Sequence, residues 1–182
     1  GCIIVIPVYF TEVSLFNFTD NLFIYTLIGV ALVEEGFKYL VLIKFFFPIK
    51  DFDEPYDGIV YSVMISLGFA TIENIKYVLF DSVAGTESSV AILRMFSAIP
   101  LHASCGVIMG YYVGKSKFKV FSFNNNKISR IISDPKYIGL LLATLIHTLY
   151  DYFLFLGEFV VFSLITLVIS IYYSKKAIKM HQ

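Results

Sequence analysis

The chain lacks tryptophan and has few charged residues. Charged side chains make up 15% of its 182 residues, whereas hydrophobic ones make up 58%. An average soluble domain has about 25% charged and 45–50% apolar residues. The mean hydropathy is +0.78. This composition excludes an ordinary soluble domain and is typical of an integral membrane protein.

Net charge and cysteine are also scarce. The formal net charge is zero, which gives no sign of a nucleic-acid-binding surface. The two cysteines, Cys2 and Cys105, both lie in apolar runs. We expect two small buried thiols rather than a disulfide. No serine has a G-x-S-x-G setting, so a serine nucleophile is not expected.

Long apolar runs are what the chain has in abundance. Because a spanning helix needs about 20 apolar residues, five stretches qualify or nearly do: 21–47, 58–80, 90–114, 137–156 and 159–174. Residues 2–10 are too short to span. The expected fold is an all-α polytopic transmembrane bundle, with about five full spans plus an N-terminal helix fragment. We expect one integral membrane domain over 1–182, whose last two helices are antiparallel neighbours.

The connections predict the orientation. Segment 115–136 and the tail at 175–179 are rich in lysine, whereas 11–20 and 81–89 contain acids and no base. The positive-inside rule therefore places the C-terminus in the cytoplasm, and alternation of the spans places 48–57 there too. The richness in Ile, Phe, Tyr, Lys and Asn favours an AT-rich genome. We expect a multi-pass protein of a bacterial cytoplasmic membrane.

Several ionisable residues lie inside the expected spans. They are Glu34, Glu35, Lys38, Glu73, Lys76, Arg94, His102, His147 and Asp151. A charge at the centre of a span costs roughly 2.5–3.5 kcal/mol. The three charged residues of 21–47 together oppose membrane insertion by about as much free energy as the apolar residues of that span favour it. This helix therefore needs polar partners on neighbouring helices.

These residues fall at similar depths on four helices, which predicts one shared site. Lys38 follows Glu34 by four residues, so the two share a helix face. That spacing leaves Glu35 as the candidate base. Asp151 likewise follows His147 by four residues. Asn74 and Arg94 are supporting candidates, and Lys76 is placed to neutralise Glu73.

Carboxylates and imidazoles in a partly dry cavity suit hydrolysis. A carboxylate there can act as general base on water, and a histidine hydrogen-bonded to an acid can stabilise an oxyanion. Glutamate and neutral histidine also bind Zn²⁺. The sequence does not demand a metal, because it has no HExxH motif. If a metal is bound, the candidate ligands are Glu35, Glu73, His102 and His147.

Four short motifs resemble those of the PrsW family of intramembrane proteases. They resemble its EExxK motif, its FxxxEN motif, its histidine followed by small residues, and its HxxxD motif. In this chain they read "EEGFK" (34–38), "FATIEN" (69–74), "HASCGVIMG" (102–110) and "HTLYD" (147–151). The motif-bearing core covers about 21–156. The family belongs to a wider group with the CAAX prenyl proteases and bacterial Abi proteins.

The resemblance implies an endopeptidase that cuts a membrane-anchored protein such as an anti-sigma factor. The prenyl-protease analogy makes the first glutamate, Glu34, the base, against the spacing argument for Glu35, and both stay open. His147 and Asp151 would hold the oxyanion or orient the water. Glu73 departs from the prenyl proteases, which have histidine there, and His102 would supply that imidazole. Both a glutamic and a metal-dependent mechanism stay open.

Two other functions fit some of these residues. A proton- or ion-coupled transporter also uses buried Glu, Lys, Asp and His. The chain is short for such a fold and shows no inverted repeat. Haem bound between His102 and His147 is a further alternative, but it would not need the surrounding carboxylates.

Overall fold

The computed structural model describes residues 1–76, 88–118 and 134–181, without the side chains of 88–95 and 181. Within these ranges the chain is helical and has no strand. The elements in chain order are η1 (Cys2–Ile4), α1 (Val5–Leu15), α2 (Leu22–Ile24), η2 (Tyr25–Ala31), α3 (Leu32–Val41), η3 (Leu42–Phe46), α4 (Pro55–Lys76), α5 (Ser88–Phe118), α7 (Pro135–Phe155) and α8 (Val160–His181). The expected all-α bundle is confirmed.

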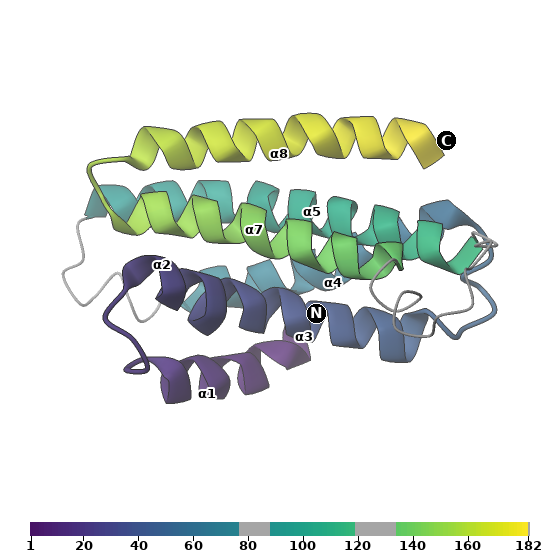
Figure 1. Ribbon diagram of the computed structural model, residues 1–182, viewed down its shortest axis with the longest axis horizontal. Helices are drawn as coiled ribbons and strands as arrows, with labels where there is room; N and C mark the ends of the chain where they lie inside the picture. The colour runs from purple at the N-terminus through teal and green to yellow at the C-terminus, as the bar shows by residue number, and fades with distance from the viewer. Residues whose placement is uncertain (77–87, 119–133, 182) are drawn as a thin grey trace.

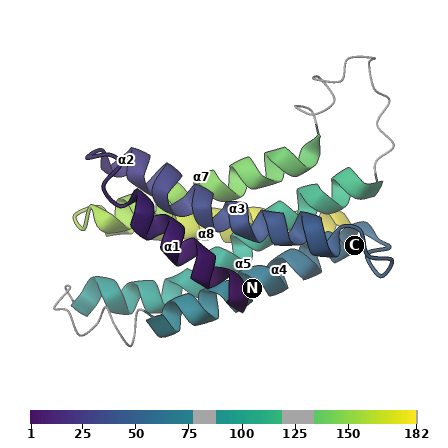
Figure 2. The ribbon, with the colours of Figure 1, turned by 90° about the horizontal axis from the view of Figure 1, so that it is seen from below.

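The helices are stacked in layers (Figure 1). α8 covers one face of the bundle, α5 and α7 lie beneath it, α3 and α4 follow, and α1 lies on the opposite face (Figure 1). Seen from below, α1 crosses in front of α3 (Figure 2). α7 and α8 run antiparallel and pack together, as expected from the short turn between them. α3 thus lies between α1 on one side and α7 on the other.

Four of the described helices are long and apolar enough to cross a membrane: Pro55–Lys76, Phe96–Phe118, Pro135–Phe155 and Val160–Met180. The fifth expected span, 21–47, is helical from Leu22 to Phe46 but is divided among α2, η2, α3 and η3. The connections 16–21 and 156–159 lie at one end of the bundle, and 47–54 lies at the other (Figure 1). The spans alternate as expected, and the chain is a multi-pass membrane protein.

Two π-helical segments flank α3. η2 precedes it and η3 follows it. The Asn21 side chain caps α2, which leads into η2, by accepting from the Ile24 amide at 3.1 Å. π segments inside helices occur frequently at functional sites, because the wider turn changes which side chains face a neighbour. The sequence did not predict them.

α4 and α5 pack backbone to backbone. A Cβ atom added to Gly58 would lie 2.7 Å from the Gly114 amide nitrogen, and one added to Gly110 would clash with the Gly58 backbone. Small residues at such crossings allow membrane helices to approach closely. This approach brings the two helices near enough for side chains further along them to hydrogen-bond.

Some expectations about the ends and loops need correction. The N-terminal helix does not stop at residue 10 but extends to Leu15, since its apolar face continues. Cys105 is buried, but Cys2 is exposed, because it lies at the start of the first helix, where few side chains cover it; its thiol donates to the Gly68 carbonyl of α4. Of the loop expected at 81–89, residues 81–87 lie outside the described residues, whereas 88–89 are helical and begin α5. Most of 115–136 and the Arg94 side chain also lie outside the described residues.

Candidate active site

Four helices bring the candidate residues into one buried layer. All of the following are less than 10% exposed: Glu34, Glu35 and Lys38 on α3, Glu73 and Asn74 on α4, His102 on α5, and His147 and Asp151 on α7. The convergence expected from their similar depths is observed in the structure. Because these side chains expose so little surface, each needs hydrogen-bonding or charged partners within the layer.

The three charged residues of α3 form a compact cluster. Lys38 Nζ donates to Glu35 Oε1 at 2.7 Å and to Glu34 Oε2 at 3.2 Å. The expected pairing of Lys38 with Glu34 is confirmed, but the expected preference for Glu34 over Glu35 is wrong, because Lys38 binds both acids and is closer to Glu35. The reason is that residues three and four apart on a helix are both within reach of a long side chain.

His102 links α3 to α4. Its Nδ1 lies 3.0 Å from Lys38 Nζ, and its Nε2 lies 2.8 Å from Glu73 Oε2. The Phe69 ring packs against both groups, with its centroid 5.6 Å from the His102 ring centroid and 4.2 Å from Lys38 Nζ. His102 therefore supplies an imidazole beside Glu73.

His147 links α7 to the same cluster. Its Nδ1 lies 3.0 Å from Glu35 Oε1, and its Nε2 lies 3.3 Å from Asp151 Oδ2 and 3.9 Å from Glu34 Oε2. The His147 and His102 rings pack edge to face with centroids 5.0 Å apart. A haem between the two rings would require them to move apart.

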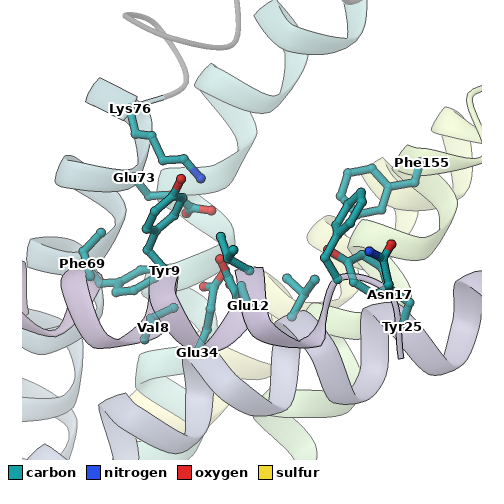
Figure 3. A pocket seen from close by; sticks show the side chains of 14 residues that line it. Val8, Tyr9, Glu12, Asn17, Tyr25, Glu34, Phe69, Glu73, Lys76 and Phe155 are labelled. Atoms are coloured by element: carbon teal, nitrogen blue, oxygen red, sulfur yellow. The ribbon is translucent and has the colours of Figure 1, made fainter. Parts of the chain in front are cut away.

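A cavity of about 530 Å³ opens onto this layer. Glu34 and Glu73 belong to its wall, and Lys76 and Phe69 of α4 lie beside them (Figure 3). The remaining lining residues come from α1, the turn after it, η2 and the end of α7, and are Val5, Val8, Tyr9, Glu12, Val13, Phe16, Asn17, Tyr25, Val30 and Phe155. The layer is thus reached through two carboxylates, under the cover of α1.

The contribution of α1 was missed by the sequence analysis. Tyr9 and Glu12 line the cavity opposite the catalytic candidates, and Lys76 Nζ lies 4.9 Å from the Tyr9 ring centroid. Segment 11–20 was interpreted as an outer connection. The available signal was the spacing of Tyr9, Glu12 and Phe16, which is three and then four residues and places them on one helix face.

One group of side chains in the described residues has the donor atoms for a metal ion. One ligand atom each from Glu34, Glu35, His102 and His147 lies within 4.8 Å of the others. This group contains Glu34, whereas the sequence-based set contained Glu73, which lies behind His102 in the structure. Glu35 Oε2 is buried and has no hydrogen-bond partner among the described residues.

Curated relatives of this chain are named "Protease PrsW". The protein of Oceanobacillus iheyensis is 36% identical over 157 residues, which are 85% of this chain and 66% of that protein. The protein of Bacillus subtilis is 33% identical over 156 residues, again 85% and 66%. A region of 93 residues, 51% of this chain and 39% of the relative, is 48% identical to the Geobacillus kaustophilus protein. The chain thus spans just under two thirds of the length of the first relatives.

No solved structure matches the chain. A family model described as "PrsW family intramembrane metalloprotease" matches residues 1–174, nearly the whole sequence. The matched range contains all four motifs and every residue of the buried layer. The chain therefore belongs to the PrsW family.

Proposed function

We propose that this chain forms the membrane-embedded core of an endopeptidase that hydrolyses a peptide bond of a membrane-anchored protein. The supporting observation is the buried layer of carboxylates and imidazoles that Glu34 and Glu73 connect to a cavity. Hydrolysis within a membrane needs groups that activate water and a space where water and an extended peptide meet them. This cavity has both features.

Glu34 is our candidate for the general base. Its side chain lines the cavity, whereas Glu35 Oε1 accepts hydrogen bonds from Lys38 and His147. Neighbouring residues on a helix point about 100° apart, so the two acids serve different neighbours. We assign Glu35 to positioning His147 and Lys38.

The reaction we propose begins when Glu34 removes a proton from water while the water oxygen attacks the scissile carbonyl carbon. His147, protonated on both ring nitrogens, keeps its Nδ1–H on Glu35 and donates its Nε2–H, which faces Asp151, to the oxyanion. The proton on Glu34 then passes to the amide nitrogen as the C–N bond breaks, leaving a carboxyl group and an amine. General base catalysis of this kind contributes about 10²–10⁴-fold.

A divalent metal such as Zn²⁺ fits the donor set of this layer. Two carboxylates and two imidazoles are ordinary zinc ligands, and the buried Glu35 Oε2 atom is an unused acceptor. Glu34, Glu35, His102 and His147 would hold the ion. When bound, it would polarise the carbonyl and lower the pKa of a water molecule. We keep the glutamic and metal-dependent mechanisms as alternatives.

The substrate and the orientation in the membrane are part of the proposal. Resemblance to the PrsW motifs supports a regulator such as an anti-sigma factor. Lys175, Lys176 and Lys179 near the end of α8 support a cytoplasmic C-terminus in a bacterial cytoplasmic membrane. Because α1 residues line the cavity, we expect the peptide to bind beside α1.

The experiment uses the protein reconstituted in liposomes with a single-span substrate whose fragments are separated on a gel. We expect Glu34→Gln and His147→Ala to abolish cleavage and Glu158→Gln, in the exposed turn before α8, to retain it. Full cleavage by both of the first two variants would overturn the proposal. Cleavage by Glu34→Gln combined with an inactive Glu35→Gln would exchange the roles of the two acids.

Proton conduction is a second candidate, which one observation favours. Hydrogen-bonding contacts run without a break from Glu73 through His102, Lys38 and Glu35 to His147. Such chains of ionisable groups carry protons in pumps and transporters. A pH-sensitive dye trapped in the same liposomes tests this function. A proton leak that disappears with Glu73→Gln, without any proteolysis by the parent protein, would favour it.

A further inference from the structure

Lys38 lies where a cation bound by the buried layer would lie. Its ammonium nitrogen is 2.7 Å from Glu35 Oε1, 3.2 Å from Glu34 Oε2 and 3.0 Å from His102 Nδ1. These are three of the four side chains whose donor atoms gather within 4.8 Å. The ammonium group therefore uses the ligands that a metal ion would use.

The contact with His102 is the critical one. An ammonium group has only donors, so His102 Nδ1 must accept from Lys38 and carries no hydrogen. The ring hydrogen then lies on Nε2, which donates to Glu73 Oε2 at 2.8 Å. The neutral His102 ring therefore has one nitrogen lone pair available, on Nδ1. This lone pair cannot accept a hydrogen bond from the ammonium group and bind a metal ion at the same time.

The charges of the buried layer also indicate that Lys38 and a metal ion are alternatives. Lys38 is 1% exposed and stands against the Glu34 and Glu35 carboxylates on its own helix. Buried carboxylates need a compensating charge, which either an ammonium group or a divalent ion provides. Two cations within about 3–4 Å of each other in such a layer repel strongly.

We infer that Lys38 is a built-in counter-cation of this site, and that a divalent metal ion binds the four ligands only when the Lys38 ammonium group moves away from His102. Lys38 is then a positioning residue that keeps the ligands in place before the ion arrives and sets the affinity for it. Glu35 serves both states, since Oε2 remains available while Oε1 is engaged. The inference rests on the metal-binding form of the proposed function.

The test measures Zn²⁺ affinity in detergent by competition with a chromophoric chelator. Lys38→Met removes the competing charge and keeps much of the side-chain volume, so we expect Zn²⁺ to bind at least about tenfold more tightly than to the parent, equivalent to about 1.4 kcal/mol. Lys44→Met is the control. It removes an equal charge at an exposed position of η3, outside the cavity and the buried layer, and should leave the affinity unchanged.

A second variant covers the case in which Lys38→Met does not fold without zinc. Lys38→Arg keeps a permanent positive charge, and its planar group is less able to leave a carboxylate. We expect at least tenfold weaker Zn²⁺ binding in this variant. The thermal shift caused by Zn²⁺ should rank in the same order, largest for Lys38→Met and smallest for Lys38→Arg.

Equal or weaker Zn²⁺ binding by Lys38→Met, or equal binding by Lys38→Arg, would overturn the inference. So would an absence of Zn²⁺ binding in every variant; intact proteolysis in that case would leave the protease proposal standing in its glutamic form. Conversely, the expected affinities together with no proteolysis by the parent protein would uphold the role of Lys38 and count against the protease.

Discussion

Two cavities of nearly equal size differ completely in chemistry. The first, of about 530 Å³, lies between α1, α3 and α4 and is lined by Glu12, Glu34, Glu73 and Lys76 among apolar residues. The second, of about 540 Å³, lies between α5, α7 and α8. Its wall is almost wholly apolar, with Lys176 as its one charged residue.

In our proposal, the burial of charged side chains, and not the cavity volume, marks the functional region of this bundle. An apolar groove on a membrane protein can contact lipid chains without an energetic cost. A wall of carboxylates cannot face lipid chains in this way, because each charge must be paired or hydrated. The first cavity continues into the layer of His102 and His147, and the second has no such continuation among the described residues.

The largest expected difference concerns stability. Lys38→Met leaves two buried carboxylates without their cation, so the free energy of unfolding without zinc should fall by about 3–5 kcal/mol. Lys176→Met, in the second cavity, removes an exposed charge and should change it by less than about 0.5 kcal/mol. Denaturant titration in mixed micelles measures both. Equal losses would mean that the charges at the two cavities are energetically alike.

The second-largest expected difference is the effect on the cleavage rate of filling each cavity with a larger side chain. Val30→Trp places an indole in the first cavity and should reduce cleavage of a single-span substrate to about a tenth or less, equivalent to about 1.4 kcal/mol. Ile146→Trp fills the second cavity and should leave cleavage unchanged. Initial rates in liposomes at equal protein content are the measurement. Inhibition by Ile146→Trp alone would move the substrate to the second cavity.

Loss of the N-cap of α7 should weaken the helix that contributes residues to the walls of both cavities, and so should not distinguish them. Asp134 accepts from the Lys136 amide at 3.2 Å, and Asp134→Ala should cost about 1 kcal/mol of stability. Partial burial raises the pKa of Asp134, but hydrogen bonds from Lys136 and Ser116 outweigh it and leave the pKa below its usual value.

A lowered pKa in the folded state means that Asp134 stabilises the fold at neutral pH and loses this effect as the pH falls through that lowered value. The difference between the parent and Asp134→Ala should therefore be constant near neutral pH and shrink in strong acid. Unfolding measured across that range checks the sign. A difference that grows in acid would contradict it.

The smallest expected effect is a difference in KM between variants that lose one of two similar lysine–tyrosine contacts. Lys76 Nζ lies 4.9 Å from the Tyr9 ring centroid at the first cavity, and Lys115 Nζ lies 5.4 Å from the Tyr111 ring centroid beside the second. Each contact is worth about 0.5–1 kcal/mol. Lys76→Met loosens α1 over the site and should raise KM about two- to fivefold, whereas Lys115→Met should leave KM unchanged. A reversed pattern in the kinetics would argue against α1 as the wall of the substrate cavity.

Much of the candidate site was readable because its contacts follow helix geometry. Glu34 and Lys38, four apart, are in contact, and so are His147 and Asp151. The pairing of His102 with Glu73 was harder, because it depends on how closely α4 and α5 approach at Gly58 and Gly110. The roles of these residues in catalysis stay predictions.

The sequence by itself determined the spans, the order of the motifs and the shared depth of the ionisable residues. Those properties follow from the thickness of a bilayer and the rise of a helix, which are the same everywhere. Only the tertiary structure decided that Glu34 reaches the cavity while Glu35 reaches His147, and that Lys38 binds both. Two adjacent acids are chemically equivalent in a sequence. They become different when α3 is placed with α1 and α4 on one side and α7 on the other.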